Sequence, residues 1–203
     1  MIMKKKLFIL PLLIAAFFAF TPKQGIEIGE TAEGLHHKVT ELDGDEKMLR
    51  EYLKPQGLLV VFSCNTCPFV EAWEDRYNEI HEMAKKEEIG MVLINSNEAF
   101  RGDEDSPENM KAHALEEGYT MPYVIDKDHK IADAFGAKTT PHVFLLDRNL
   151  KLVYKGAIDD NYENKDEVKK QYLKDAITAM ASGKEISPQT SKALGCSIKR
   201  VKK

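Results

Sequence analysis

Residues 57–68 read Gly-Leu-Leu-Val-Val-Phe-Ser-Cys-Asn-Thr-Cys-Pro, an unbroken apolar run followed by two cysteines that are separated by two residues. The apolar run, residues 57–62, predicts a buried strand, and the three- and four-residue spacing of apolar side chains in residues 69–86 predicts a helix. Cys64 and Cys67 therefore lie where a strand leads into a helix. Because a helix N-terminus favours the thiolate of the first cysteine, Cys64 is the expected nucleophile and Cys67 the thiol that resolves a mixed disulfide.

A Cys-x-x-Cys pair can also be half of a zinc site, which requires two further ligands elsewhere in the chain. The other candidate ligands are Cys196 and six histidines, and no second pair has the spacing of a zinc knuckle. The sequence therefore predicts no metal and no other cofactor. A non-catalytic binder of a metal ion or of a partner chain stays open as an alternative interpretation.

The first 24 residues have the composition of a leader. Three lysines at 4–6 precede fourteen uncharged, mostly apolar residues at 7–20, and a polar segment follows at 21–24. This pattern predicts a signal peptide or an uncleaved N-terminal anchor over residues 1–24, and an exported protein in the periplasm or another extracytoplasmic compartment. Outside the cytosol no glutathione pool keeps thiols reduced, so a redox partner must set the state of the pair.

Composition describes an ordinary folded protein. The chain has 203 residues, of which 43% are hydrophobic and 31% charged, and its net charge of -4 gives no argument for a nucleic-acid partner. We expect one domain over residues 25–203 that ends in a solvated basic tail at residues 199–203.

Strand and helix patterns alternate along this domain. We expect a strand or hairpin within residues 26–42, a short helix capped by Asp45 and ending at residue 53, and a solvated acidic loop over residues 97–105. Further strands are expected at residues 89–95, 123–125, 143–146 and 152–157, and further helices at residues 107–117, 129–135 and 166–182. Together they predict an α/β fold with a mixed central sheet and helices on both faces.

A second motif, Thr139-Thr140-Pro141-His142, precedes the closing hairpin. Together with the dithiol it resembles the thioredoxin superfamily, in particular the redoxin branch of peroxiredoxin-like or AhpC/TSA-like thioredoxin-domain proteins, over residues 30–199. The resemblance implies a thioredoxin-like fold, a cis peptide bond at Pro141 that faces the dithiol, and a Thr140 backbone that pairs with a protein partner. The residues alone leave open a trans proline at the edge of a strand.

The sequence departs from that family at the dithiol. True peroxiredoxins have a threonine where this chain has Val61, which places a peroxide pocket in doubt. Thioredoxins have a tryptophan where this chain has Ser63, and an acid in the preceding strand, which here is wholly apolar. Proton transfer from Cys67 would then depend on solvent or on a neighbour such as His142, Glu71 or Glu98.

Three further residues are candidates for an auxiliary role. Asn65 and Thr66 lie between the two cysteines, but their identities do not set the direction of electron flow. Cys196 lies beyond the last expected helix, where it could fold back over the sheet. An odd thiol in an exported protein suggests intermolecular pairing, a second resolving role or burial as a small apolar group, and we expect burial.

These features predict an exported thiol-disulfide oxidoreductase that exchanges disulfides with protein thiols, with a membrane electron donor if it acts as a reductant. The alternative is a thiol peroxidase, in which Cys64 becomes a sulfenic acid that Cys67 or Cys196 resolves.

Overall fold

The computed structural model describes residues 25–201. The leader expected at residues 1–24 lies outside the described residues. Among the described residues, no helix combines the length and the apolar character that crossing a bilayer requires.

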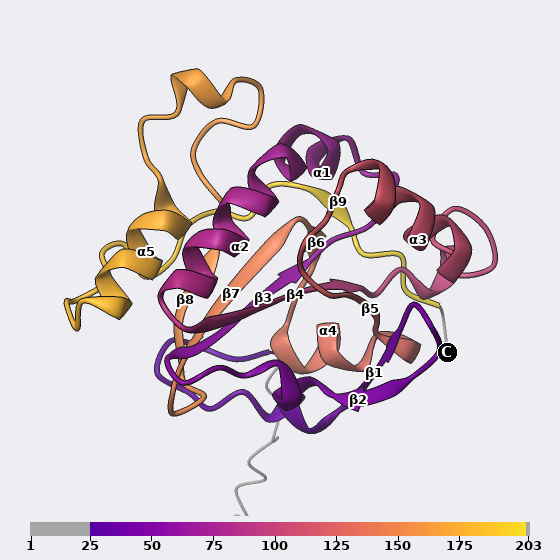
Figure 1. Ribbon diagram of the computed structural model, residues 1–203, viewed down its shortest axis with the longest axis horizontal. Helices are drawn as coiled ribbons and strands as arrows, with labels where there is room; N and C mark the ends of the chain where they lie inside the picture. Colours follow the sequence, from indigo (N-terminus) through magenta and orange to yellow (C-terminus); the bar gives the residue numbers. More distant parts are fainter. Residues whose placement is uncertain (1–24, 202–203) are drawn as a thin grey trace, which may run out of the picture.

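Strands form two groups that meet along β3 and β4 (Figure 1). In the first group β5 pairs in parallel with β4 and antiparallel with β1, and in the second β7 pairs antiparallel with β3 and β8. At the junction, the Ser63 N–H donates to the Ile94 carbonyl at 2.9 Å. The first group has the order β2 (Glu46–Met48), β1 (Lys38–Glu41), β5 (Tyr123–Ile125), β4 (Ile89–Asn95), and the second has β3 (Gly57–Phe62), β7 (His142–Asp147), β8 (Leu152–Gly156). The expected mixed sheet is confirmed.

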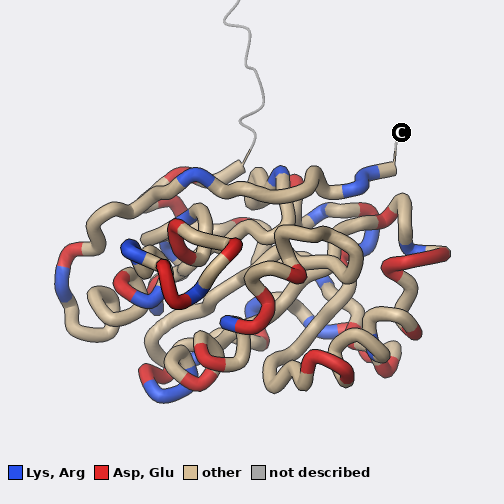
Figure 2. The backbone as a smooth tube through the Cα atoms, turned by 90° about the horizontal axis from the view of Figure 1, so that it is seen from above, with Lys and Arg blue, Asp and Glu red and all other residues tan. Residues whose placement is uncertain are grey.

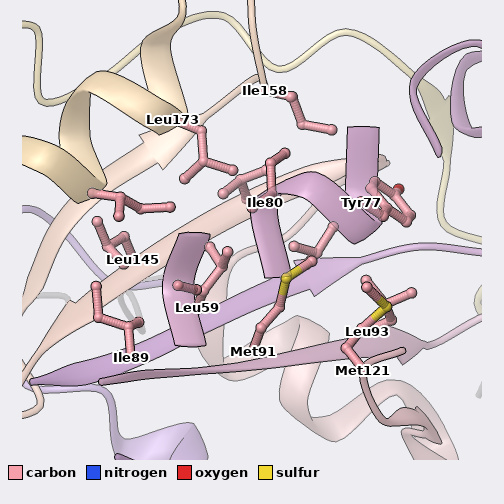
Figure 3. Packing of buried hydrophobic residues seen from close by; sticks show 14 of the residues in the cluster. Leu59, Tyr77, Ile80, Ile89, Met91, Leu93, Met121, Leu145, Ile158 and Leu173 are labelled. Carbon is pink, nitrogen blue, oxygen red and sulfur yellow. The ribbon is translucent and has the colours of Figure 1, made fainter. Parts of the chain in front are cut away.

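Helices cover both faces of these strands (Figure 1). One face packs against α1 (Pro68–Trp73), α2 (Tyr77–Lys86) and α5 (Tyr172–Ala181), and the other packs against α4 (Lys130–Phe135). Side chains alternate between the faces because successive residues of a strand point in opposite directions. Figure 3 shows the first face, where Leu59, Ile80, Leu145 and Leu173 meet from two strands and two helices.

The remaining helices lie in the connections. The helix α3 (Pro107–Glu116) begins at Ser106, whose hydroxyl accepts a hydrogen bond from the Asn109 N–H. Short 3-10 turns occur at Glu33–His36, Leu49–Tyr52, Glu74–Arg76, Glu98–Phe100, Lys127–His129 and Lys165–Glu167.

Three local expectations are wrong. Asp45 does not cap a helix, because residues 46–48 instead form β2, where Glu46 pairs with Lys38 of β1 at 2.8 Å. The helix expected over residues 69–86 is interrupted by the 3-10 turn Glu74–Arg76. The last helix begins at Tyr172 rather than at residue 166, because Asp160 accepts the N–H groups of Lys169 and Lys170 in an extended segment.

The C-terminal segment returns to the sheet. Its strand β9 (Cys196–Ser197) pairs antiparallel with β6 (Thr139–Thr140) beside α1 (Figure 1). Beyond it, Arg200 Nε lies 2.8 Å from Asp133 Oδ1, so the expectation of a freely solvated basic tail is wrong for residues 199 and 200. Elsewhere, basic and acidic residues are interspersed along the chain (Figure 2).

Candidate active site

The two thiols of the Cys-x-x-Cys motif lie at the junction of β3 and α1. Cys64 follows β3, and Cys67 is the N-cap of α1, which begins at Pro68. Both cysteines are free thiols, with 2% and 3% of their surface exposed. We expected the helix N-terminus to act on Cys64, but because the helix begins after the motif, its first N–H groups lie at Cys67.

Thr140 touches both sulfurs. The Thr140–Pro141 peptide bond is cis, as the resemblance implied. The Thr140 hydroxyl lies 3.1 Å from Cys64 Sγ, and the Thr140 carbonyl oxygen lies 3.1 Å from Cys67 Sγ. The predicted neighbourhood of Thr140, Pro141 and the dithiol is therefore present in the structure.

A buried carboxylate holds the segment between the cysteines. Asp105 is fully buried, and its Oδ1 accepts a hydrogen bond from the Asn65 N–H at 3.0 Å. The side-chain amides of Asn95 and Asn97 donate to the same carboxylate at 2.6 and 2.8 Å. On its other side, Asn65 Oδ1 accepts a hydrogen bond from the Tyr123 hydroxyl at 2.9 Å. These contacts fix Asn65, and with it the path of the chain from one cysteine to the next.

Sequence reasoning missed this anchor because Asp105 ends the acidic run 103–105, which we expected to be solvated. The expectation is wrong for Asp105 and for Asn97, which is 3% exposed. A usable signal was present: both residues flank a loop between a buried strand and a capped helix, where short polar side chains commonly satisfy backbone groups.

Cys196 lies at the dithiol and is half-buried, so the expectation of a buried apolar cysteine is not met. In the register of β6 and β9, Cys196 stands opposite Thr140. The Cys196 thiol and its backbone N–H both interact with the Cys67 sulfur, and the Phe69 N–H donates to the Cys196 sulfur. Cys67 therefore interacts with both of the other cysteines, and Cys196 packs against the cluster that holds Cys64 and Cys67.

Hydrogen bonding decides which sulfur carries charge. The bond from the Cys64 thiol lowers the pKa of Cys67 to about 4 against the effect of burial, and bonds from Cys196 and from the Val70 N–H act in the same direction. The same thiol pair raises the pKa of Cys64, and burial raises it further. With β9 in place, the donors around Cys67 outnumber those around Cys64, which favours charge on Cys67 over charge on Cys64.

Thr140 acts in the opposite direction. Its hydroxyl donates to Cys64 and lowers the pKa of that thiol, and its carbonyl can accept a hydrogen bond only from a protonated Cys67. Thr140 therefore stabilises the state in which the proton has moved from Cys64 to Cys67. Its hydroxyl donates to the Cys64 thiolate, and its carbonyl accepts from the Cys67 thiol.

The other candidate residues stand apart from the sulfurs. His142 stacks on Phe144, with ring centroids 4.4 Å apart, and burial lowers the pKa of His142 to about 4. Among the residues that the structure describes, no hydrogen bond joins His142 to either thiol of the motif. Glu98 faces Arg101 at 3.8 Å, and Thr66 is exposed. The described chain also contains no cluster of three or more histidine, cysteine or acidic side chains that could hold a metal ion.

Comparison with known proteins agrees with this geometry. The AhpC/TSA family model matches residues 28–155. A curated relative, thiol-disulfide oxidoreductase ResA of Geobacillus thermodenitrificans (strain NG80-2), is 29% identical over 133 residues, which are 66% of this chain and 71% of ResA.

Two solved structures extend the comparison. One is an uncharacterized conserved protein from Geobacillus kaustophilus, 32% identical with a TM-score of 0.80, which covers 87% of this chain and 94% of that one. The other, a thioredoxin-like protein in its oxidized form, is 20% identical with a TM-score of 0.62 and covers 79% of this chain and 100% of its own. The fold is thioredoxin-like.

Proposed function

Because this chain belongs to the AhpC/TSA family, we propose that its dithiol exchanges disulfides with protein partners. The protein is a thiol-disulfide oxidoreductase, the activity in the name of its relative ResA. One observation carries this function: two free thiols meet the cis Thr140–Pro141 bond, where one threonine contacts both sulfurs.

Exchange begins on Cys64. A proton passes from Cys64 to Cys67, and the Cys64 thiolate attacks one sulfur of a partner disulfide, so that a mixed disulfide forms and the other partner sulfur leaves as a thiolate. Cys67 then loses its proton and attacks Cys64 Sγ, which releases the second partner thiol and leaves a Cys64–Cys67 disulfide. The partner gains two electrons and the protein loses two; the reverse sequence oxidises a partner.

Asn65 and Thr66 have supporting roles in this proposal. Asn65, fixed by Asp105 and Tyr123, holds the loop so that the two sulfurs keep their places. Thr66 lies between the two cysteines in the chain and is exposed, and it would contact the partner. The partner strand would pair with the Thr140 backbone, the position that β9 holds in this structure.

We further propose that the reaction takes place outside the cytoplasm. The support is the basic and apolar pattern of residues 1–24, which is typical of an export signal or an anchor. A protein kept reduced there requires an electron source, and a membrane donor is the class of partner that could supply one.

Redox equilibration tests the function. The full chain is equilibrated in glutathione and dithiothreitol buffers, its thiols are trapped by alkylation, and the modified cysteines are identified by mass spectrometry. We expect a reversible Cys64–Cys67 couple, and loss of protein-disulfide exchange in Cys64→Ser. A potential below about -250 mV would indicate a reductant, and one above about -180 mV an oxidant.

The same samples test the peroxidase alternative. The position where peroxiredoxins have threonine is Val61, which is 1% exposed in the apolar core and offers no hydroxyl. Stoichiometric consumption of peroxide by a reduced protein that shows no reversible Cys64–Cys67 couple would contradict the proposed function and favour a peroxidase.

A further inference from the structure

The segment that carries Cys196 is held on the dithiol from both sides. Before β9, the Ser191 hydroxyl accepts a hydrogen bond from the Ala157 N–H at 2.9 Å. After β9, the Ile198 N–H donates to the Lys138 carbonyl at 3.0 Å, and the Ile198 side chain is buried in the core. Residues 192–197 therefore form a short bridge over the thiols, with little freedom to place Cys196 elsewhere.

Gly195 allows this close approach. A Cβ built on Gly195 would stand 2.2 Å from the Thr140 carbonyl oxygen, so no other residue fits without displacing the strand. Cys196 follows directly, opposite Thr140 in the β6–β9 register. The next residue, Ser197, points away and is exposed, because neighbouring side chains of a strand face opposite directions.

This placement brings the three cysteines close enough for disulfide exchange among them. Cys67 interacts with both Cys64 and Cys196, and Cys196 packs against the cluster of the two motif cysteines, opposite the Thr140 that contacts both sulfurs. The Phe69 N–H, in the first turn of α1, donates to the Cys196 sulfur and favours its thiolate. Cys196 is also more exposed than the two thiols of the motif, which are almost fully covered.

We infer that Cys196 is a third redox-active thiol of this protein, which takes over the disulfide by exchange with Cys67. The inference rests on the proposed function, which supplies the Cys64–Cys67 disulfide. The Cys196 thiolate attacks Cys67 Sγ, the Cys64–Cys67 bond breaks, a Cys67–Cys196 disulfide forms, and Cys64 leaves as a thiolate beside the Thr140 hydroxyl. One disulfide is consumed and one is formed, so no further oxidant is required.

The charge on Cys67 controls when Cys196 can act as a nucleophile. In the reduced protein, burial and the charged neighbour Cys67 raise the pKa of Cys196 to about 11, so Cys196 stays protonated. Once Cys67 is part of a disulfide it carries no charge, and that contribution disappears. Cys196 therefore becomes a better nucleophile only when a disulfide is present for it to attack. The transfer moves the disulfide from two covered sulfurs to one that a partner's thiol can reach.

Disulfide mapping tests the inference. The full chain and its Cys64→Ser variant are each incubated with glutathione disulfide, alkylated and digested without reduction, and the linked peptides are identified by mass spectrometry. In Cys64→Ser we expect an intramolecular Cys67–Cys196 disulfide. In the unmodified chain we expect that disulfide beside Cys64–Cys67, and only Cys64–Cys67 in Cys196→Ser.

A matched control moves the thiol by one residue. In the Cys64→Ser background, the pair of changes Cys196→Ser and Ser197→Cys puts a cysteine on the far side of β9, and we expect loss of the intramolecular disulfide. The inference is overturned if Cys67 and Cys196 form only mixed or intermolecular disulfides, or if the displaced cysteine pairs with Cys67 equally well. Absence of Cys64–Cys67 from both the full chain and Cys196→Ser would instead contradict the proposed function, while Cys64→Ser still reports on Cys67–Cys196.

Discussion

Gly195 crosses the Thr140–Pro141 peptide bond so closely that a Cβ would stand 2.2 Å from the Thr140 carbonyl oxygen and 3.2 Å from the Pro141 nitrogen. The contact joins the C-terminal strand to the peptide bond that faces both thiols. It also explains why the two sulfurs are covered, since β9 can lie against β6 only while residue 195 lacks a side chain.

Gly195→Ala should therefore loosen β9 and uncover the dithiol. If the clash weakens the docking of β9 by about 1.4 kcal/mol, within the usual range for a point mutation, the undocked population rises about tenfold. We expect the thiols of the reduced protein to react with an alkylating reagent faster by a similar factor. Gly102→Ala is the matched control, because a Cβ at Gly102 meets nothing within 4 Å. Equal labelling rates in both variants would contradict the covering role of β9.

Thr140→Val should slow the attack by Cys64. In the unmodified protein the Thr140 hydroxyl lies 3.1 Å from Cys64 Sγ and lowers the pKa of that thiol. The variant removes this hydroxyl. A lost hydrogen bond to a charged group, at about 1.5 kcal/mol, reduces the thiolate about tenfold; the greater nucleophilicity of a more basic thiolate leaves a net loss of about threefold. The measurement is the rate of disulfide exchange at neutral pH.

The neighbour Thr139 offers a control for that measurement. Its hydroxyl is buried and has no hydrogen-bond partner among the described residues. Thr139→Val should leave the exchange rate unchanged and should not destabilise the fold, because it removes no hydrogen bond. If Thr139→Val slows exchange as much as Thr140→Val does, the effect comes from packing and not from the hydroxyl on Cys64.

The sequence predicted well those elements whose cause is local. β3, β4 and β5 have the expected bounds because each is an apolar run bounded by polar, glycine or proline residues. Ser106 likewise begins α3 as its N-cap, and Gly136 ends α4 as its left-handed C-cap, both as predicted. The dithiol was located by its motif, and the cis Thr140–Pro141 bond was implied by the resemblance to the thioredoxin superfamily.

What the sequence did not reveal depends on contacts between distant segments. β9 has two residues, too few for any periodic pattern, and its partner is more than fifty residues away in the chain. The requirement for glycine at 195 arises from a carbonyl on that partner. Asp105 looked like one charge of a solvated run, and only the amides that surround it explain its burial.

Asp105→Asn should destabilise the protein and make Cys64 more acidic. An amide cannot accept at both positions, so one of the three donors around the carboxylate, such as the Asn97 amide, is left unpaired. We expect a loss of about 2 kcal/mol in the free energy of unfolding by denaturant. Because the charge of Asp105 raises the pKa of Cys64, its removal should lower that pKa in a thiolate titration. Asp103→Asn, at an exposed position of the same loop, should change neither quantity.

The pair His113 and Glu74 should make stability depend on pH. His113 Nε2 lies 2.8 Å from Glu74 Oε2, and this hydrogen bond raises the pKa of His113 above 6.5. Burial raises the pKa of Glu74, but the bonds from His113 and Tyr119 outweigh it, so that the pKa lies below 4.5. The contribution of His113 to stability is therefore complete below about pH 6.5 and is lost as the pH rises through the pKa of His113 in the folded protein. The contribution of Glu74 is lost as the pH falls through the pKa of Glu74 in the folded protein.

We expect the stability difference between the unmodified protein and His113→Gln to shrink by about 1 kcal/mol between about pH 6 and pH 9. The measurement is the free energy of unfolding by denaturant across this range. His81→Gln is the control, because burial shifts the pKa of His81 in the opposite direction, downward. The contribution of His81 to stability therefore falls only when the pH is lowered. Between about pH 7 and pH 9 the difference for His81→Gln should stay constant. If the stability difference for His113→Gln also stays constant between about pH 6 and pH 9, Glu74 does not hold the proton on His113.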